Sequence, residues 1–142
     1  MKKLLIIVVV LLAALAWASD KQESIESLKA RADQAQPKDQ VDLFTRIAER
    51  QLDSLVQAYN GGTVRQAQAA LADVVTYGVK AAHVSSATGK RMKQTEIAMR
   101  KISGRLEAIR KTLEVDDRPP LADAVQKLDA ARSELLNRMF RK

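Results

Sequence analysis

The chain contains no cysteine, which excludes disulfides, thiol nucleophiles, cysteine metal ligands and a lipidated N-terminal cysteine. Five glycines and three prolines in 142 residues are too few for an all-β sandwich or for an enzyme built on long loops. Aromatic residues make up only 4% of the chain, which leaves little material for stacking on bases or sugars. These shortages favour one modest domain made of helices.

The longest apolar run lies at the N-terminus. Lys2 and Lys3 precede the uncharged apolar residues 4–16, and Ala16-Trp17-Ala18 has the small residues of an A-x-A cleavage site. A helix over residues 4–18, which are 15 residues, would be about 23 Å long, whereas a bilayer-spanning helix needs roughly 20 residues. We therefore predict that residues 1–18 are a cleaved secretory signal peptide and that the protein is exported, periplasmic or secreted. An uncleaved N-terminal membrane anchor is the alternative.

The rest of the chain is rich in Ala, Leu, Gln, Glu, Lys and Arg, which are good helix formers. Its apolar residues recur three and four positions apart, the spacing of amphipathic helices. Residues 19–36 are expected to form a short polar helix or a flexible lead-in, and residues 37–142 the helical bundle domain. Helices of the bundle are predicted over residues 37–59, 63–84, 88–114 and 120–140.

Helix stops separate these segments. Asn60-Gly61-Gly62 ends the first, Thr63 caps the second, and Pro119-Pro120 interrupts the chain before the last. Ser85 to Gly89 is the candidate for the remaining turn. Short joins favour antiparallel neighbours, so the pattern predicts an all-α, up-down antiparallel four-helix bundle preceded by a short N-terminal helix. The alternative is a long helical hairpin or coiled coil with residues 63–114 as one helix, because the apolar phase continues through the candidate turn.

The second predicted helix has an unusual seam, made mostly of small residues. Such a seam either lets two backbones approach closely or leaves a groove that something else fills. Its residues are Val64, Ala67, Leu71, Val74, Gly78 and Ala81.

Few residues suggest catalysis. His83 is the only histidine, with no second histidine four positions away to make a zinc pair. Glu49 and Asp53 share a helix face, but nearby arginines favour a solvated, salt-bridged surface over acid–base chemistry. Asp116-Asp117 has too few oxygen ligands for a calcium loop. We therefore expect no enzyme, no cofactor and no metal site.

The charge is unevenly distributed. Residues 86–112 hold eight basic and two acidic residues, a net charge of +6, whereas the chain after residue 18 has 22 basic and 17 acidic residues, a net charge of +5. The cations that point away from the apolar stripe of helix 88–114 form a candidate contact surface for a partner. Acidic residues on helix 37–59, namely Asp39, Asp42, Glu49 and Asp53, would otherwise neutralise it. The candidate contact residues are Lys90, Lys93, Arg100, Lys101, Arg105 and Lys111.

These features favour a non-catalytic, exported binding module that contacts an anionic protein or another anionic envelope component. One alternative is a peripheral protein that binds anionic lipid, and another is a periplasmic holdase-like chaperone that uses the small-residue groove. Export makes nucleic acid a poor candidate partner. The sequence is also compatible with a homo-oligomer.

Overall fold

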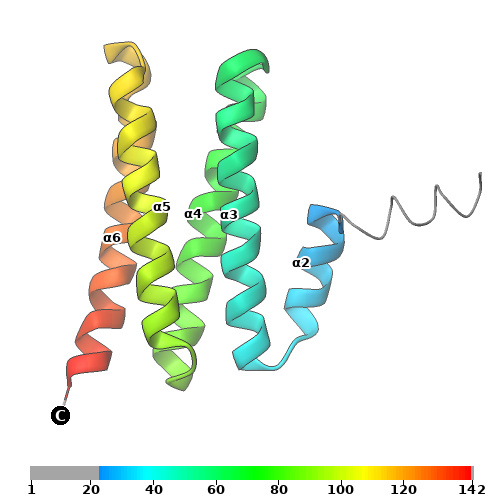
Figure 1. Ribbon diagram of the computed structural model, residues 1–142, viewed down its shortest axis with the longest axis vertical. Coiled ribbons are helices and arrows are strands. Elements are labelled where there is room, and N and C mark those ends of the chain that lie inside the picture. The colour runs from blue at the N-terminus through cyan, green and yellow to red at the C-terminus, as the bar shows by residue number, and fades with distance from the viewer. Residues whose placement is uncertain (1–22, 142) are drawn as a thin grey trace, which may run out of the picture.

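The computed structural model describes residues 23–141. Four long helices run alternately up and down, and a shorter helix packs beside α3 (Figure 1). This architecture confirms the predicted bundle with its preceding short helix. The elements are α2 (Ile25–Gln34), α3 (Pro37–Gly61), α4 (Val64–Thr88), α5 (Met92–Thr112), the 3-10 helix η1 (Val115–Asp117) and α6 (Pro119–Phe140).

The predicted stops between α3 and α4 and between α5 and α6 are confirmed. Pro37 opens α3, where its missing N–H costs no helical hydrogen bond. Thr63 caps α4 in a reciprocal arrangement: its Oγ1 accepts from the backbone N–H of Gln66 at 3.1 Å, and the Gln66 side chain accepts from the Thr63 N–H at 3.0 Å. Two orphan N–H groups at the start of α4 are thereby satisfied.

The turn between α4 and α5 lies later than expected. The alternative of one helix over residues 63–114 is wrong, because Gly89 and Arg91 adopt left-handed backbone conformations with φ of 73° and 57°. The expected turn over 85–89 is also misplaced, since α4 continues to Thr88 and α5 begins only at Met92.

Hydroxyl side chains explain the displacement of this turn. Thr88 Oγ1 donates to the Val84 carbonyl at 2.6 Å, so the threonine stays inside the helix instead of ending it. Ser85 Oγ donates to the Lys90 carbonyl at 2.6 Å, and Thr95 Oγ1 donates to the Arg91 carbonyl at 2.7 Å. The Ser85 and Thr88 hydroxyls therefore hold the end of α4 and the turn that follows it, and the Thr95 hydroxyl holds the start of α5.

Two hairpins, α3–α4 and α5–α6, stand side by side and bury a shared core. Within each hairpin the helices pack closely, and α4 also packs along α6. Gly78 sits at this second contact, where a Cβ built on it would lie 2.7 Å from Leu128 Cδ2. The small seam thus brings α4 close to α6, and its members from Ala67 to Ala81 are buried. Fully buried core residues include Leu52, Leu55, Val74, Leu106, Leu121 and Leu128.

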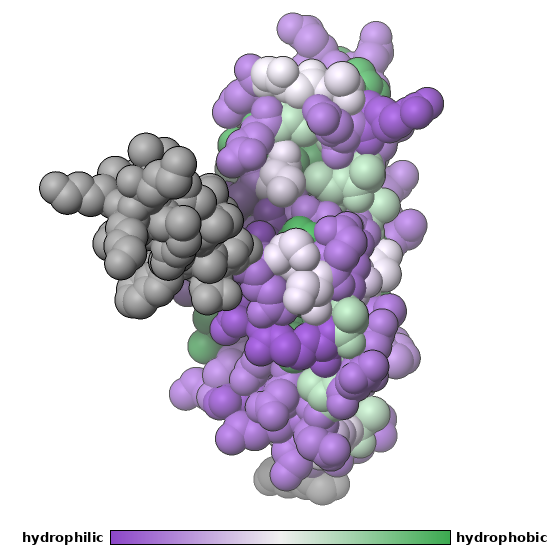
Figure 2. Space-filling model, turned by 90° about the vertical axis from the view of Figure 1, so that its right-hand side faces the viewer, coloured by the Kyte–Doolittle hydropathy of each residue, from purple (hydrophilic) through white to green (hydrophobic). Residues whose placement is uncertain are grey.

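A second apolar cluster fixes α2 to the outside of the bundle. Leu28 and Ala32 are buried against Phe44 and Ile47 of α3 and Ala81 of α4. The surface on the α2 side of the molecule is largely hydrophilic where it is coloured, with small apolar patches scattered over it (Figure 2). The short polar helix therefore docks through a narrow stripe.

The candidate signal peptide, residues 1–18, lies outside the described residues. Among the helices of residues 23–141, none is long and apolar enough to cross a membrane.

Candidate functional site

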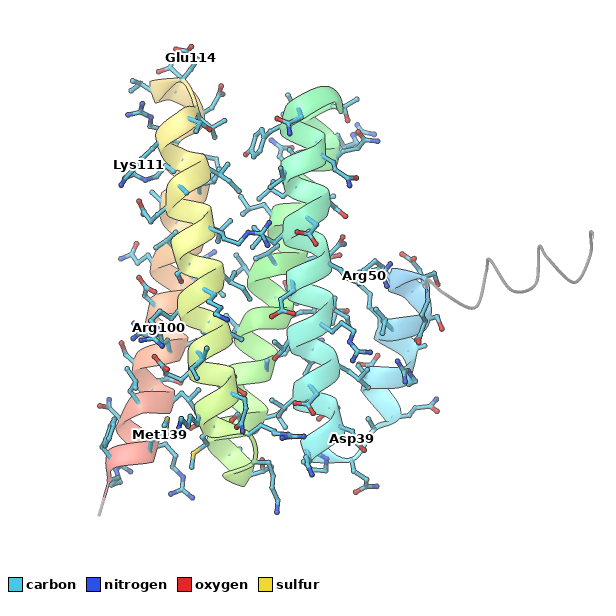
Figure 3. The ribbon with its side chains drawn as sticks, in the orientation of Figure 1. Asp39, Arg50, Arg100, Lys111, Glu114 and Met139 are labelled. Atoms are coloured by element: carbon cyan, nitrogen blue, oxygen red, sulfur yellow. The ribbon has the colours of Figure 1, made fainter. Side chains whose placement is uncertain are left out.

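Four exposed cations form a stripe on the outer face of α5. Lys93, Arg100 and Lys111 are separated by 7 and 11 residues, close to whole numbers of helical turns, so they lie on one side of the helix. Arg100 and Lys111 are visible on that side in Figure 3. Lys101 is adjacent, and we call these four residues the α5 basic stripe.

The other two candidates lie elsewhere. Arg105 faces α3, where its Nη2 donates to Asp53 Oδ1 at 3.0 Å. Lys90 belongs to the turn before α5, and its backbone N–H donates to Thr88 Oγ1 at 3.3 Å. Of the six expected contact residues, the structure therefore keeps four together along the helix.

Acidic residues of α3 neutralise part of the positive charge. Asp53 pairs with Arg105, and Asp42 pairs with Arg91 at 3.2 Å, so two of the four expected carboxylates do reach across to the basic segment. Both pairs connect α3 with the start or middle of α5. They act between the hairpins, and they leave the outer face of α5 uncovered.

The stripe itself is weakly compensated. Arg100 Nη2 lies 4.0 Å from Glu96 Oε2, while the other Glu96 oxygen accepts from Arg132 Nε at 2.9 Å. Within residues 23–141, Lys93, Lys101 and Lys111 have no carboxylate within 4.0 Å. These three exposed ammonium groups are available to an anionic partner.

A second candidate surface is an apolar groove of about 580 Å³ between α4 and α6. It continues into a neighbouring hollow of about 400 Å³ toward the start of α6. The groove lies beside the buried small-residue seam of α4 and not on it. Its lining includes Val75, Val79, His83, Lys127, Ala130 and Ala131.

The groups considered for catalysis are scattered. His83 is exposed at the edge of the α4–α6 groove. Glu49 is exposed on α3, and Asp53 is engaged by Arg105. In the described part of the chain no three His, Cys, Asp or Glu side chains converge as metal ligands would.

One site was not anticipated from the sequence. Tyr59, beside the stop of α3, lies near Asp116 and Asp117 of η1 in a hollow at one end of the bundle. Burial, and to a smaller extent the negative charge of Asp117, raises the pKa of Tyr59 above 10.0. The predicted up-down topology could have indicated this site, because alternating helix directions bring the α3–α4 and α5–α6 connections to the same end of the bundle.

Comparison of the chain with protein-family models, with curated proteins and with solved structures gives no match. Function is therefore inferred from the residues themselves.

Proposed function

We propose that the protein is a non-catalytic, exported binding module and that the α5 basic stripe docks an acidic protein or another anionic envelope component. The observation that carries the proposal is the set of three lysines, Lys93, Lys101 and Lys111, exposed on one helix without a carboxylate within 4.0 Å among the described residues. Export is inferred from the signal-like residues 1–18.

Exposed cations attract an anionic partner over a Debye length, about 10 Å at 0.1 M salt. Because the four stripe residues are held on one rigid helix, their fields add along it and speed encounter with a complementary surface. Binding through such a stripe should weaken steeply as salt is added.

The neighbours of the stripe favour a protein partner over a lipid surface. A helix that lies in a membrane interface usually places Trp, Phe or Leu beside its cations. Between Lys93 and Lys111, the outer face of α5 instead carries one half-buried isoleucine, Ile97, and two exposed small residues, Gly104 and Ala108, with no aromatic residue. The stripe therefore offers charge with little apolar area to insert into a bilayer.

Neutralising the stripe tests the proposal. The variant carries Lys93→Gln, Arg100→Gln, Lys101→Gln and Lys111→Gln. A matched control loses four exposed cations outside the stripe that form no ion pair within residues 23–141, through Lys38→Gln, Arg46→Gln, Arg65→Gln and Lys90→Gln. Both variants have the same net charge, so a difference between them reports position and not total charge.

The probes are poly-glutamate, vesicles of phosphatidylglycerol, vesicles of phosphatidylcholine, and an envelope extract at two salt concentrations. We expect the wild type and the control to bind poly-glutamate and the same extract proteins at low salt, and the stripe variant to lose at least tenfold in affinity. Equal binding by all three proteins contradicts the stripe as the contact surface. Stronger binding to phosphatidylglycerol vesicles than to poly-glutamate would replace the protein partner with a membrane surface.

The groove between α4 and α6 supports a second candidate function, that of a holdase for exposed apolar segments. The groove is lined mainly by apolar groups, and its volume of about 580 Å³ lies within the range of ligand-binding clefts, about 300–1,000 Å³. Ala130→Glu would place a charge in the groove, and Ala122→Glu places one on the exposed face of α6 away from it. A holdase should delay aggregation of a heated client, and only Ala130→Glu should abolish the delay. No delay by the wild type contradicts this function.

A further inference from the structure

The α3–α4 and α5–α6 connections lie at the same end of the bundle (Figure 1). This end contains a cavity of about 420 Å³. Apolar residues from both hairpins form its walls, and carboxylates stand at its edge. The walls include Tyr59, Val64, Ala67, Leu71, Leu113 and Pro120.

Two features of this cavity indicate the chemistry of a group that would bind in it. Val64 on its wall is 75% exposed, and Val115, which precedes the lining residue Asp116 in the sequence, is 69% exposed, so apolar surface lies open to water at this end. Asp116 and Asp117 line the cavity, and no lysine or arginine does. Lys111, the nearest cation of the stripe, points to the opposite side of α5 (Figure 3). An apolar side chain flanked by cations would match both features.

The opposite end of α6 carries such a group. Phe140, the last residue of α6, is 76% exposed, more than any other large hydrophobic residue within 23–141. Arg138 and Arg141 precede and follow it closely in the sequence and are exposed, and neither has a carboxylate within 4.0 Å in the described chain. Arg138 Nε donates to the Ser86 carbonyl at 3.3 Å, which holds this end of α6 against α4.

The cavity and the aromatic end cannot meet within one molecule. Pro120 lines the cavity at the start of α6, and Phe140 lies at the end of the same helix. A helix of 22 residues is about 33 Å long. The end of α6 can therefore enter only the cavity of another copy.

We propose that the protein self-associates head to tail, with Phe140 of one copy entering the cavity beside Tyr59 of the next. Arg138 and Arg141 then face Asp116 and Asp117, so the charges are complementary as well as the apolar groups. Because the two surfaces differ, the contact is heterologous and each added copy leaves one free cavity and one free Phe140. The assemblies are short open chains that lengthen with concentration and shorten with salt. This contact uses the ends of the bundle and is independent of the α5 basic stripe.

Two variants that each lose one side of the contact provide the test. The tail variant carries Phe140→Ala and Arg141→Glu, and the head variant carries Asp116→Lys and Asp117→Lys; all four positions are exposed. Circular dichroism checks that each remains helical. Sedimentation velocity is measured on the protein as it is purified from the expressing cell, after any processing of its N-terminus there.

We expect the average mass of the wild type to rise beyond two copies as concentration increases, while each variant stays a monomer. An equimolar mixture should form dimers and nothing larger, because one intact cavity meets one intact Phe140. A chain that combines Asp116→Lys and Asp117→Lys with Arg138→Glu and Arg141→Glu should associate again, since both charge sets are exchanged.

Several outcomes would overturn the proposal. A wild type that stays monomeric at 1 mM rules out the contact, and variants that associate like the wild type place it elsewhere. A mixture that remains monomeric while the wild type associates shows that cavity and Phe140 are not partners. The stripe variant with four glutamines should associate like the wild type, so loss of anion binding and loss of self-association are separate results.

Discussion

Arg105 of α5 donates a hydrogen bond to Asp53 of α3 at 3.0 Å, although the two residues are 52 positions apart in the sequence. Both are half exposed or more, with side-chain exposures of 50% and 64%. The pair joins the two hairpins across the α3–α5 contact, and it removes one cation from the surface that we propose for partner binding.

The strength of this pair can be measured with a double-mutant cycle of Arg105→Gln and Asp53→Asn. Exposed pairs typically contribute about 0.2–1 kcal/mol, so we expect a coupling of that size in urea unfolding, reduced in high salt. Arg46→Gln combined with Asp53→Asn is the control, since Arg46 is exposed and lies two turns away on α3. Fully additive effects for Arg105 and Asp53 would show that the contact contributes nothing to stability.

Two glycines inside helices should respond in opposite directions to alanine. Gly104 of α5 has no atom within 4 Å of a built Cβ, so Gly104→Ala should stabilise the protein by roughly 1 kcal/mol through helix propensity. Gly78→Ala has the same gain in helix propensity, but it also introduces a steric clash. The new Cβ would lie 2.7 Å from Leu128 Cδ2 and 3.5 Å from Met99 Sδ.

Leu128 is fully buried, so its side chain has little room to retreat. Overpacking a core costs about 1–3 kcal/mol, which exceeds the helical gain. We expect urea unfolding to show a lower midpoint for Gly78→Ala and a higher one for Gly104→Ala. A stabilised Gly78→Ala variant would mean that α4 and α6 are less closely packed than described.

The ion pair that helps to hold α2 should make stability depend on alkaline pH. Lys29 Nζ lies 2.8 Å from Asp73 Oδ2, and this hydrogen bond raises the pKa of Lys29 above 10.5 against the opposing effect of burial. A raised folded-state pKa contributes stability that is fully present below 10.5 and is lost as pH rises through the folded value.

Lys29→Met removes this contribution and keeps most of the apolar stem. We expect the wild type to melt at a higher temperature than the variant at pH 8, and the difference to shrink above pH 10.5. Other groups titrate in both proteins and cancel in the comparison. A difference that stays constant through this range would contradict a stabilising role for the Lys29 charge.

Processing at the predicted cleavage site has a spectroscopic consequence. Trp17 is the only tryptophan of the chain and lies before the cleavage point after Ala18. The exported protein should therefore begin at Ser19 in intact mass spectrometry and show tyrosine but no tryptophan emission. A mass that begins at Met1, with tryptophan emission, would instead favour the membrane anchor.

Local sequence signals predicted the elements of the fold. Pro37, Thr63 and Pro119 act through their own backbone geometry or through hydrogen bonds within four residues, so their effects can be read without knowing the fold. The sequence predicts the turn after α4 too early, because Ser85 and Thr88 are residue types that disfavour the interior of a helix. Their hydroxyls instead found carbonyl partners, and one of these, that of Lys90, becomes available only once the turn has formed.

Periodicity and composition are properties of neighbouring residues, so the amphipathic helices, the signal-like start and the cation-rich segment can all be read from the amino-acid order. Which cations stay free depends on contacts between helices, since Arg105 and Arg91 meet carboxylates of α3 while Lys93, Lys101 and Lys111 meet none within residues 23–141. The tertiary structure also placed Tyr59 beside Asp117 and Phe140 at the far end of the bundle. The physical reason is that charge pairing and cavity shape depend on distances of a few ångströms between helices, and those distances are set by how the whole core packs.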